Sequence, residues 1–361
     1  MKINLLGKPQ VIMSNPLSRH NYFAWPTVCR LKNGRIAVAA SGFRLKHICP
    51  FGKTVLSISE DEGETYTLPA PVIDTVLDDR DGGIMAFGHS GAIVTSFNNT
   101  LGFQKNLVKE GDGYLKNYLD LITTQEEERD IGAQFRISFD NAVTFGEVHK
   151  SPVTSPHGPI ELRDGTILWV GRTFSPVNEI QPDTDCIKAY RVNLDGSMEY
   201  LGQIENIYVD GRRLLSCEPC AFETNDGRII CHIRAQVYST PQIFTTYQCE
   251  STDGGRTWSK PYPLLEREGG APAHIMRHCS GVLISVYGYR KGPYGIKAMF
   301  SLDEGRTWDT GHDLYVNHVG GDLGYPSTIE LTDGSLLTVF YAVDKEGEPA
   351  KIYQQKWSFE K

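Results

Sequence analysis

Ionisable side chains recur at the start of apolar strand-turn-strand segments along this chain. Two of them, Tyr325 and Glu218, have the residue types of a nucleophile and its base. A tyrosine with a pKa near 10 is a poor nucleophile at neutral pH, and a carboxylate within hydrogen-bond reach corrects this. Carboxylates and histidines at equivalent positions have the types needed for proton transfer. The candidate catalytic residues are Tyr325, Glu218, Asp79, Asp81, His47 and His157.

A second set of residues suits the recognition of an anion. Arginines stand at the ends of the second strands of several segments, and a guanidinium binds a carboxylate through two parallel hydrogen bonds. Any one of these residues alone is more often structural, so their recurrence at equivalent positions is what indicates a shared pocket. The candidate substrate-binding residues are Arg44, Arg80, Arg172, Arg234, His274, Arg290, Asp322 and Trp25.

These residues need a scaffold that gathers distant segments. Six stretches read as an apolar strand, a glycine turn and a second apolar strand, which is the pattern of a β-hairpin. Their spacing is that of four-stranded blades, so the sequence predicts an all-β, six-bladed β-propeller formed as a single domain by residues 1–361. The N-terminal "KINLL" or "QVIM" would close the ring by adding a strand to the last blade. The hairpins begin at Trp25, Gly82, Pro156, Glu218, Pro272 and Tyr325.

A repeated string follows several of these hairpins. Ser-x-Asp-x-Gly-x-Thr-aromatic begins at Ser59, Ser251 and Ser301, and a degenerate copy begins at Ser138. The aspartate accepts hydrogen bonds from its own turn and the aromatic residue packs beneath it, so the string is interpreted as scaffolding. One active site does not need several copies of the same carboxylate. The strings resemble the Asp boxes of the sialidase (neuraminidase) superfamily, which also implies a six-bladed propeller.

The resemblance assigns roles to individual residues. Tyr325 resembles the sialidase nucleophile, Glu218 the glutamate paired with it, and Arg234 and Arg290 two arginines of the carboxylate clamp. A sialoside carries a carboxylate at its anomeric carbon, so a tyrosine nucleophile avoids the repulsion that an anionic one would meet. The clamp carried over to this chain comprises Arg44, Arg234 and Arg290, with Arg80 as a possible addition.

The chain departs from the family pattern at two positions. The string "YFAWP" has Ala24 where sialidases have an arginine. The string "RLKHICPFGK" has His47 or Cys49 where the family has its acid/base aspartate. The candidates for the leaving-group proton are therefore Asp79, Asp81 and His47.

The resemblance implies a sialidase-like exo-glycoside hydrolase acting on a small acidic glycan. Two alternatives stay open. Histidines, arginines and a tyrosine in one bowl also suit a lyase, which neutralises a uronate carboxylate and abstracts the neighbouring proton, or an unusual glycosidase on uronate- or deoxysugar-containing glycans. The second alternative is a non-catalytic propeller that binds sugar.

The charge and composition of the chain limit the classes of partner that we expect. The formal net charge is −8 and no block of Lys and Arg breaks it, which argues against nucleic acid and anionic membranes. No signal peptide or membrane-spanning run is visible, so a cytoplasmic location is expected. The Cys-x-x-Cys of Cys217 and Cys220 lacks a βαβ context and is interpreted as strand residues. No metal or cofactor signature is seen, and the sequence gives no indication of oligomeric state.

Overall fold

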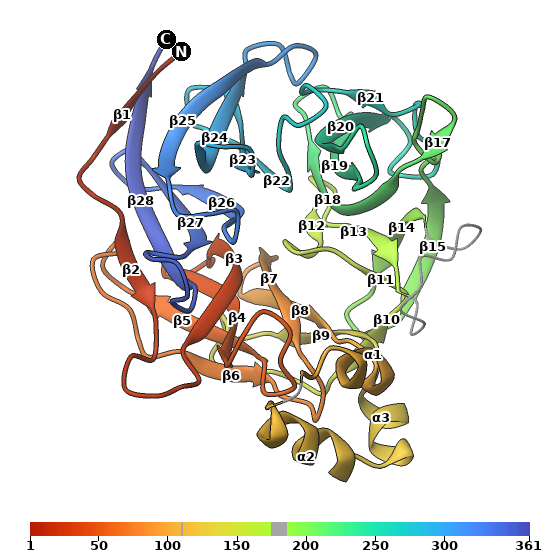
Figure 1. Ribbon diagram of the computed structural model, residues 1–361. Helices are drawn as coiled ribbons and strands as arrows, with labels where there is room; N and C mark the ends of the chain where they lie inside the picture. Colours follow the sequence, from red (N-terminus) through yellow and green to blue (C-terminus); the bar gives the residue numbers. More distant parts are fainter. Residues whose placement is uncertain (110, 175–185) are drawn as a thin grey trace.

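The computed structural model describes residues 1–109, 111–174 and 186–361, and these form a ring of β-sheets around a central axis (Figure 1). The strand pairs are antiparallel, and strands follow the chain order within each sheet from the axis outward. The predicted six-bladed β-propeller is therefore confirmed, and the predicted hairpins are the two inner strands of each blade. The two termini lie side by side at the edge of the ring.

The first three blades occupy the first half of the chain. Blade 1 contains β3 (Tyr22–Arg30), β4 (Ile36–Arg44), β5 (Lys53–Ser59) and β6 (Ala70–Ile73). Blade 2 contains β7 (Arg80–Phe87), β8 (Gly91–Phe97), β9 (Ala133–Ser138) and β10 (His149–Ser151). Blade 3 contains β11 (Val153–Thr154), β12 (Ile160–Glu161), β13 (Ile167–Thr173), β14 (Ile187–Val192) and β15 (Met198–Gln203).

The remaining blades follow a short hairpin of β16 (Tyr208–Val209) and β17 (Arg212–Arg213). Blade 4 contains β18 (Leu215–Glu223), β19 (Ile229–Val237), β20 (Ile243–Ser251) and β21 (Tyr262–Pro263). Blade 5 contains β22 (Ala273–Arg277), β23 (Leu283–Tyr289), β24 (Tyr294–Ser301) and β25 (Asp309–Asn317). Blade 6 contains β26 (Gly324–Glu330), β27 (Leu336–Ala342), β28 (Lys351–Glu360), β1 (Lys2–Leu5) and β2 (Gln10–Met13).

Closure of the ring uses both N-terminal segments. Strand β1 pairs with β28 from Lys2 opposite Glu360, and β2 pairs with the same strand from Gln10 opposite Gln354. The first and last residues of the chain thus share one sheet, which covers the edge that β28 would otherwise expose. Neighbouring blades also share buried apolar clusters, such as the one that joins Val38 of blade 1 to Val339 of blade 6.

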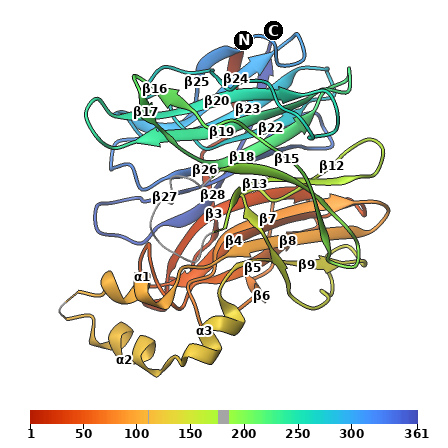
Figure 2. The ribbon, with the colours of Figure 1, turned by 90° about the vertical axis from the view of Figure 1, so that its right-hand side faces the viewer.

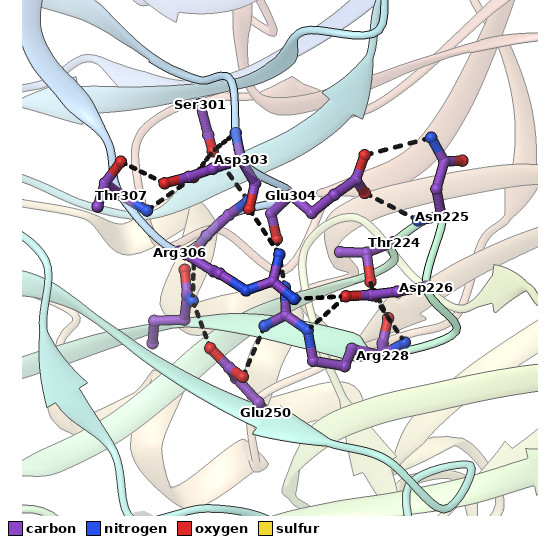
Figure 3. A network of polar contacts seen from close by, with 12 residues as sticks. Thr224, Asn225, Asp226, Arg228, Glu250, Ser301, Asp303, Glu304, Arg306 and Thr307 are labelled. Atoms are coloured by element: carbon purple, nitrogen blue, oxygen red, sulfur yellow. Dashed lines mark hydrogen bonds and ion pairs between the residues drawn. The ribbon is translucent and has the colours of Figure 1, made fainter.

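The repeated Ser-x-Asp string forms a turn that binds itself. In blade 5, the Asp303 carboxylate accepts hydrogen bonds from the Thr307 backbone at 2.9 Å, the Thr307 hydroxyl at 2.6 Å and the Ser301 hydroxyl at 2.8 Å (Figure 3). The next arginine, Arg306, reaches Asp226 of blade 4 at 2.7 Å. The same internal bonds recur around Asp61 and Asp253. The carboxylates are committed to the turns, as the scaffolding interpretation requires.

The aromatic residue of the string anchors the turn to the preceding blade. Tyr66 follows β5 of blade 1, and its hydroxyl donates to Gln354 Oε1 of blade 6 at 2.8 Å. Trp308 follows β24 of blade 5, and its indole N–H donates to Gln248 Oε1 of blade 4 at 3.0 Å. Each aromatic side chain therefore links two sheets as well as packing under its own turn.

A helical insertion between β8 and β9 was not expected from the sequence (Figure 2). It consists of α1 (Leu101–Asn106), α2 (Gly113–Leu121) and α3 (Thr124–Asp130). A capping box between Thr123 and Glu126 begins α3. None of the helices in the described part of the chain is long and apolar enough to cross a membrane.

The insertion supports a loop that reaches the axis. Phe51 packs on Tyr118 of α2 with ring centroids 4.6 Å apart and on Tyr114 at 5.1 Å. The Lys46 ammonium pairs with the Asp112 carboxylate at the start of α2. These contacts fix both ends of the loop that carries His47 between β4 and β5.

Candidate active site

Four inner strands bulge at equivalent places and present one side chain each. Trp25, Asp81, Glu218 and Tyr325 have φ angles of 55°, 49°, 50° and 50°, which residues with a Cβ rarely adopt. The pairing register of their strands shifts around each of them, and Pro or Gly follows each. Such backbone costs on the order of 1–3 kcal/mol per residue and concentrates at functional sites. The repeated strain points to this level of the axis as the site.

Tyr325 and Glu218 meet across the axis. The Tyr325 hydroxyl donates to Glu218 Oε1 at 2.5 Å, although the residues belong to blades 6 and 4. The other carboxylate oxygen accepts from Arg234 Nη1 at 2.6 Å, and the same Nη1 lies 3.2 Å from the Tyr325 oxygen. Arg234 is itself held by Gln236 Oε1, 2.8 Å from its Nε. Nucleophile, base and cation thus form one contact group.

The surroundings hold Tyr325 in its neutral form. Burial raises the pKa of its hydroxyl well above the usual value, and the negative charge of Glu218 raises the pKa further. Arg234 and Arg290 act in the opposite direction. The hydroxyl proton therefore stays on Tyr325 at rest and already points at the carboxylate that can take it, so ionisation would accompany bond formation.

The structure separates the two aspartates proposed as proton donors. Asp79 is fully buried, and its carboxylate accepts from the backbone N–H of Thr75 at 2.7 Å and from its hydroxyl at 2.9 Å, so it stabilises its own loop. None of the described residues donates a hydrogen bond to the Asp81 carboxylate. Burial raises the pKa of Asp81 to about 7, and the nearby Glu218 charge adds to the rise. Burial raises the pKa of Asp79 to about 7 as well, so Asp81 differs in that its carboxyl is not hydrogen-bonded by any described residue and can act as an acid.

His47 belongs to a polar cluster at the rim of the site. Its Nδ1 lies 3.0 Å from the Tyr22 hydroxyl and 3.5 Å from an Asp322 oxygen, and Tyr22 donates to both Asp322 oxygens at 3.0 Å. Arg80 Nη2 lies 3.4 Å from His47 Nε2. Burial lowers the pKa of His47 and the adjacent Arg80 charge acts in the same direction, whereas the Asp322 carboxylate acts against them; the net direction is downward. A neutral ring whose Nε2 faces a guanidinium is a poor proton donor.

Two of the predicted clamp arginines are consumed by structural contacts. Arg44 is fully buried; its guanidinium donates to the Ser41 hydroxyl at 2.7 Å and pairs with Asp78. Arg80 also contacts Asp78, at 3.3 Å, and lies over the Trp25 ring at 3.9 Å. Both arginines donate to the His47 carbonyl at 2.8 Å. They hold the loop of His47 and the Trp25 ring in place.

Two other arginines have no acidic partner among the described residues. Arg290 donates to the Leu323 carbonyl at 3.0 Å and to the Tyr341 hydroxyl at 3.3 Å, and its guanidinium lies 5.8 Å from the centre of the Tyr325 ring. Arg172 is half-buried at the end of β13, near β18. Within the described ranges, no carboxylate forms an ion pair with either residue. Their charge is available to a ligand.

The predicted histidines His157 and His274 do not join Tyr325. Their rings contact each other, with centroids 5.0 Å apart, and they line a different cavity, which also includes Arg30 and Glu223 at the far ends of β3 and β18. The expectation of one shared bowl was therefore wrong for these two residues. The physical reason is the position of the two histidines along the axis. His157 lies beside Thr27, two residues beyond the bulged Trp25 of β3, and is therefore nearer the other end of the axis.

Several contributors were missed by sequence reasoning. Tyr22 and Tyr341 position Asp322 and Arg290, and Asp78 neutralises two arginines. Asp78 stands in "LDDRD" beside Asp79 and Asp81, and only these two were predicted to be catalytic. A usable signal was the Pro or Gly after each bulged residue, because a break in an inner strand marks a side chain with unusual direction.

The strained inner strands of this propeller converge on the buried group of Tyr325, Glu218 and Arg234. The protein therefore has a sialidase-like propeller fold. The chain belongs to the BNR repeat-like domain family, whose model matches residues 122–338, more than half of its length. Comparison with curated proteins finds no match.

Solved structures agree on the fold. A protein of unknown function from Dyadobacter fermentans is 19% identical, with a TM-score of 0.76 and 99% of each chain covered. The NanB sialidase from Streptococcus pneumoniae is 11% identical, with a TM-score of 0.69, covering 97% of this chain and 70% of the other. The Penicillium chrysogenum α-L-arabinanase is 13% identical, with a TM-score of 0.64, covering 99% and 98%. The chain therefore has a glycosidase-like propeller fold.

Proposed function

We propose that the protein is a sialidase-like exo-glycoside hydrolase acting on a small acidic oligosaccharide. The observation that carries the proposal is the 2.5 Å hydrogen bond from the Tyr325 hydroxyl to Glu218 at the axis of the propeller. A tyrosine that only filled a core would not need a carboxylate from another blade, and burying that carboxylate is costly unless it is used or paired. Arg234 supplies that pairing, with its Nη1 at 2.6 Å from Glu218 Oε2.

The residues support a two-step reaction. Tyr325 Oη attacks the anomeric carbon while Glu218 takes its proton, and the bond to the leaving oxygen breaks as Asp81 protonates that oxygen. The resulting tyrosyl-glycoside is then hydrolysed. Asp81, now ionised, takes a proton from water as the water oxygen bonds to the anomeric carbon. The bond from that carbon to Tyr325 Oη breaks, and Glu218 returns its proton to the departing Tyr325 oxygen. Each residue ends in its starting state.

Charge at the site supports an acidic substrate. Arg290 and Arg172, on blades 5 and 3, flank the Glu218–Arg234 pair of blade 4 and keep their charge uncompensated by other described side chains. A substrate carboxylate between them would form charge-assisted hydrogen bonds that a neutral sugar cannot form. Because Arg44 and Arg80 are tied to Asp78, they shape the site instead of binding the anion.

A cavity beside His47 and Asp322 gives the leaving group a place. Its volume is about 660 Å³, which lies within the range of small-molecule sites. Its walls carry both signs of charge, including Lys46 and Glu346. A saccharide leaving group, with many hydroxyls, suits such a wall better than an apolar aglycone. A cytoplasmic location stays a prediction made from the sequence.

A lyase acting on uronate-containing glycans is the second candidate. Buried Tyr325 with the Arg290 guanidinium 5.8 Å from its ring suits it, because an arginine neutralises the uronate carboxylate and lowers the barrier to proton abstraction. The placement of His157 and His274 in another cavity removes two bases that this reaction would use, which favours hydrolysis. A protein that only bound sugar would not require the strained backbone at Tyr325 and Glu218.

A panel of sialosides, uronate oligosaccharides and neutral oligosaccharides tests the proposal. Products are analysed by mass spectrometry and ultraviolet absorbance. Hydrolysis gives products whose masses sum to substrate plus one water. An unsaturated, ultraviolet-absorbing sugar would assign the lyase reaction instead, and saturable binding without any turnover would assign the sugar-binding role.

A further inference from the structure

A second cavity lies toward the other end of the inner strands. Its volume is about 400 Å³, within the range of small-molecule sites, and the proposed glycosidase reaction does not use it. We call it the lower axial cavity, because Arg30 and Glu223 at its mouth are the last residues of inner strands β3 and β18. Its walls are mainly apolar and include Val28, Ile84, Met85, Ala221, Phe222 and Ile275.

One residue that lines this cavity carries a buried polar atom with no partner among the described residues. His157 is 5% exposed, and its Nε2 accepts or donates no hydrogen bond to any described residue. Its Nδ1 lies 3.0 Å from the Thr27 hydroxyl, which also donates to the Pro156 carbonyl at 3.1 Å. The single hydroxyl proton goes to the carbonyl, so both contacts exist together only if His157 Nδ1–H is the donor. Nε2 is then an unprotonated acceptor.

His274 supplies the complementary group. Its Nδ1 accepts from the Thr328 backbone N–H at 3.3 Å, so in a neutral ring the proton is on Nε2. Burial lowers the pKa of His274 to about 4 and that of His157 well below its usual value, so both rings are neutral near pH 7. With ring centroids 5.0 Å apart, the two neighbouring rings offer one acceptor and one donor.

The charged side chains at the mouth already have polar partners. Arg30 pairs with Glu62 at 2.7 Å, Glu161 pairs with Lys32 at 3.1 Å, and Glu223 accepts a backbone N–H at 2.7 Å. The guanidinium of Arg163, which also lines the cavity, donates to the Asn225 carbonyl at 2.9 Å. An ion would lose its hydration here without compensation.

We propose that the lower axial cavity binds a small neutral molecule with an apolar body and one hydroxyl group. The hydroxyl donates to His157 Nε2 and accepts from His274 Nε2–H, while the apolar body contacts the walls. A hydroxyl is the simplest group that is donor and acceptor at one atom, and it satisfies the orphan acceptor that is otherwise costly to bury. The site is separate from Tyr325 and stands without the proposed glycosidase activity.

Phenol and anisole form a matched pair of probes. They share the aromatic body, but anisole has lost the hydroxyl proton. Isothermal titration of the 361-residue protein is expected to show saturable phenol binding and affinity for anisole at least about tenfold lower, because anisole leaves His157 Nε2 unpaired. Equal affinities for the two, or no saturable phenol binding, would overturn the proposal and leave water as the occupant.

Substitution locates the binding. In His157→Phe the ring is kept and the acceptor removed, so phenol affinity should fall to that of anisole, whereas Tyr325→Phe should bind phenol as the unaltered protein does. Retained discrimination in His157→Phe contradicts the assignment. A measurement that needs no variant is the imidazole nitrogen spectrum of the unaltered protein: phenol should shift the unprotonated His157 Nε2 signal, and an unshifted signal at saturation would equally sink the idea.

Discussion

The hydroxyl of Tyr325 lies 2.5 Å from Glu218 Oε1, and 107 residues of chain separate the two. Both residues sit in left-handed backbone at the bulge of an inner strand, with φ of 50° each. The same backbone distortion on two blades therefore aims a nucleophile and its base at one point. A propeller makes this arrangement from sequence-distant segments because all its inner strands face a common axis.

Replacing Tyr325 with Phe removes the proposed nucleophile and keeps the ring. We expect turnover of the substrate found in the panel to fall at least about a thousandfold. Stability should change by only about 1 kcal/mol, the net value of one hydrogen bond. The matched control is Tyr287→Phe, which alters a tyrosine that is 2% exposed in the blade 5 core. Turnover near that of the unaltered protein in Tyr325→Phe would remove Tyr325 from the mechanism.

Replacing Glu218 with Gln removes the base and also the negative charge beside Tyr325. Turnover should fall by about a hundredfold to ten-thousandfold, the usual value of a general base. Because the Glu218 charge raises the pKa of Tyr325, its loss should lower that pKa, which ultraviolet difference titration against Tyr325→Phe would measure. A Tyr325 pKa that stays fixed or rises would show that the carboxylate does not act on the hydroxyl.

The fold was predictable because its signals are local and repeated. Glycine turns between apolar strands specify hairpins, and the hydrogen bonds of the Asp303 turn depend only on residues within a few positions. The Tyr325–Glu218 pair was predictable through its likeness to sialidases. The three-helix insertion was not foreseen, although the capping box of Thr123 and Glu126 signals a helix start.

The details of the site depended on long-range register. His157 and His274 begin hairpins as Glu218 does, yet they lie deeper along the axis and meet each other. Which arginines are free depends on where Asp78 lies, and two fully or nearly buried arginines share it. The sequence near Arg44 or Arg80 does not indicate that both residues pair with Asp78, because these ion pairs form only once the blades are packed.

The ionisation of Asp81 is expected to cause the fall of turnover at alkaline pH. A pKa of about 7 keeps the carboxyl protonated below pH 7, so the acid is present there and is lost as pH rises through 7. Turnover of substrates with poor leaving groups should therefore decline above pH 7. Asp81→Asn should lower it by about a hundredfold or more, and an aryl glycoside whose leaving group needs no proton should retain most activity. Asp79→Asn is the matched control; equal effects of the two variants on both substrates would contradict the role of Asp81.

Arg290 is expected to discriminate acidic from neutral substrates. Arg290→Lys keeps the charge but loses the planar fork, so kcat/KM for the acidic substrate should fall about tenfold to a hundredfold, mainly through KM. A neutral analogue of the same sugar should be affected little. Arg277→Lys provides a control, because that arginine pairs with Glu304 at the outer turn and is remote from Tyr325. Equal losses for the acidic and the neutral substrate would show that Arg290 supports the fold instead of binding the anion.

The Ser-x-Asp turns should affect stability without affecting chemistry. In Asp303→Ala the Thr307 backbone N–H, the Thr307 hydroxyl and the Ser301 hydroxyl lose their common acceptor. We expect the free energy of unfolding to fall by about 1–3 kcal/mol, the net value of two or three intramolecular hydrogen bonds, with kcat unchanged below the new unfolding transition. Denaturant unfolding and steady-state kinetics on one preparation measure both quantities. Because Asp303 lies at an outer turn whose Arg306 reaches only the neighbouring blade, a large loss of kcat in a folded Asp303→Ala protein would mean that the turn communicates with the axis.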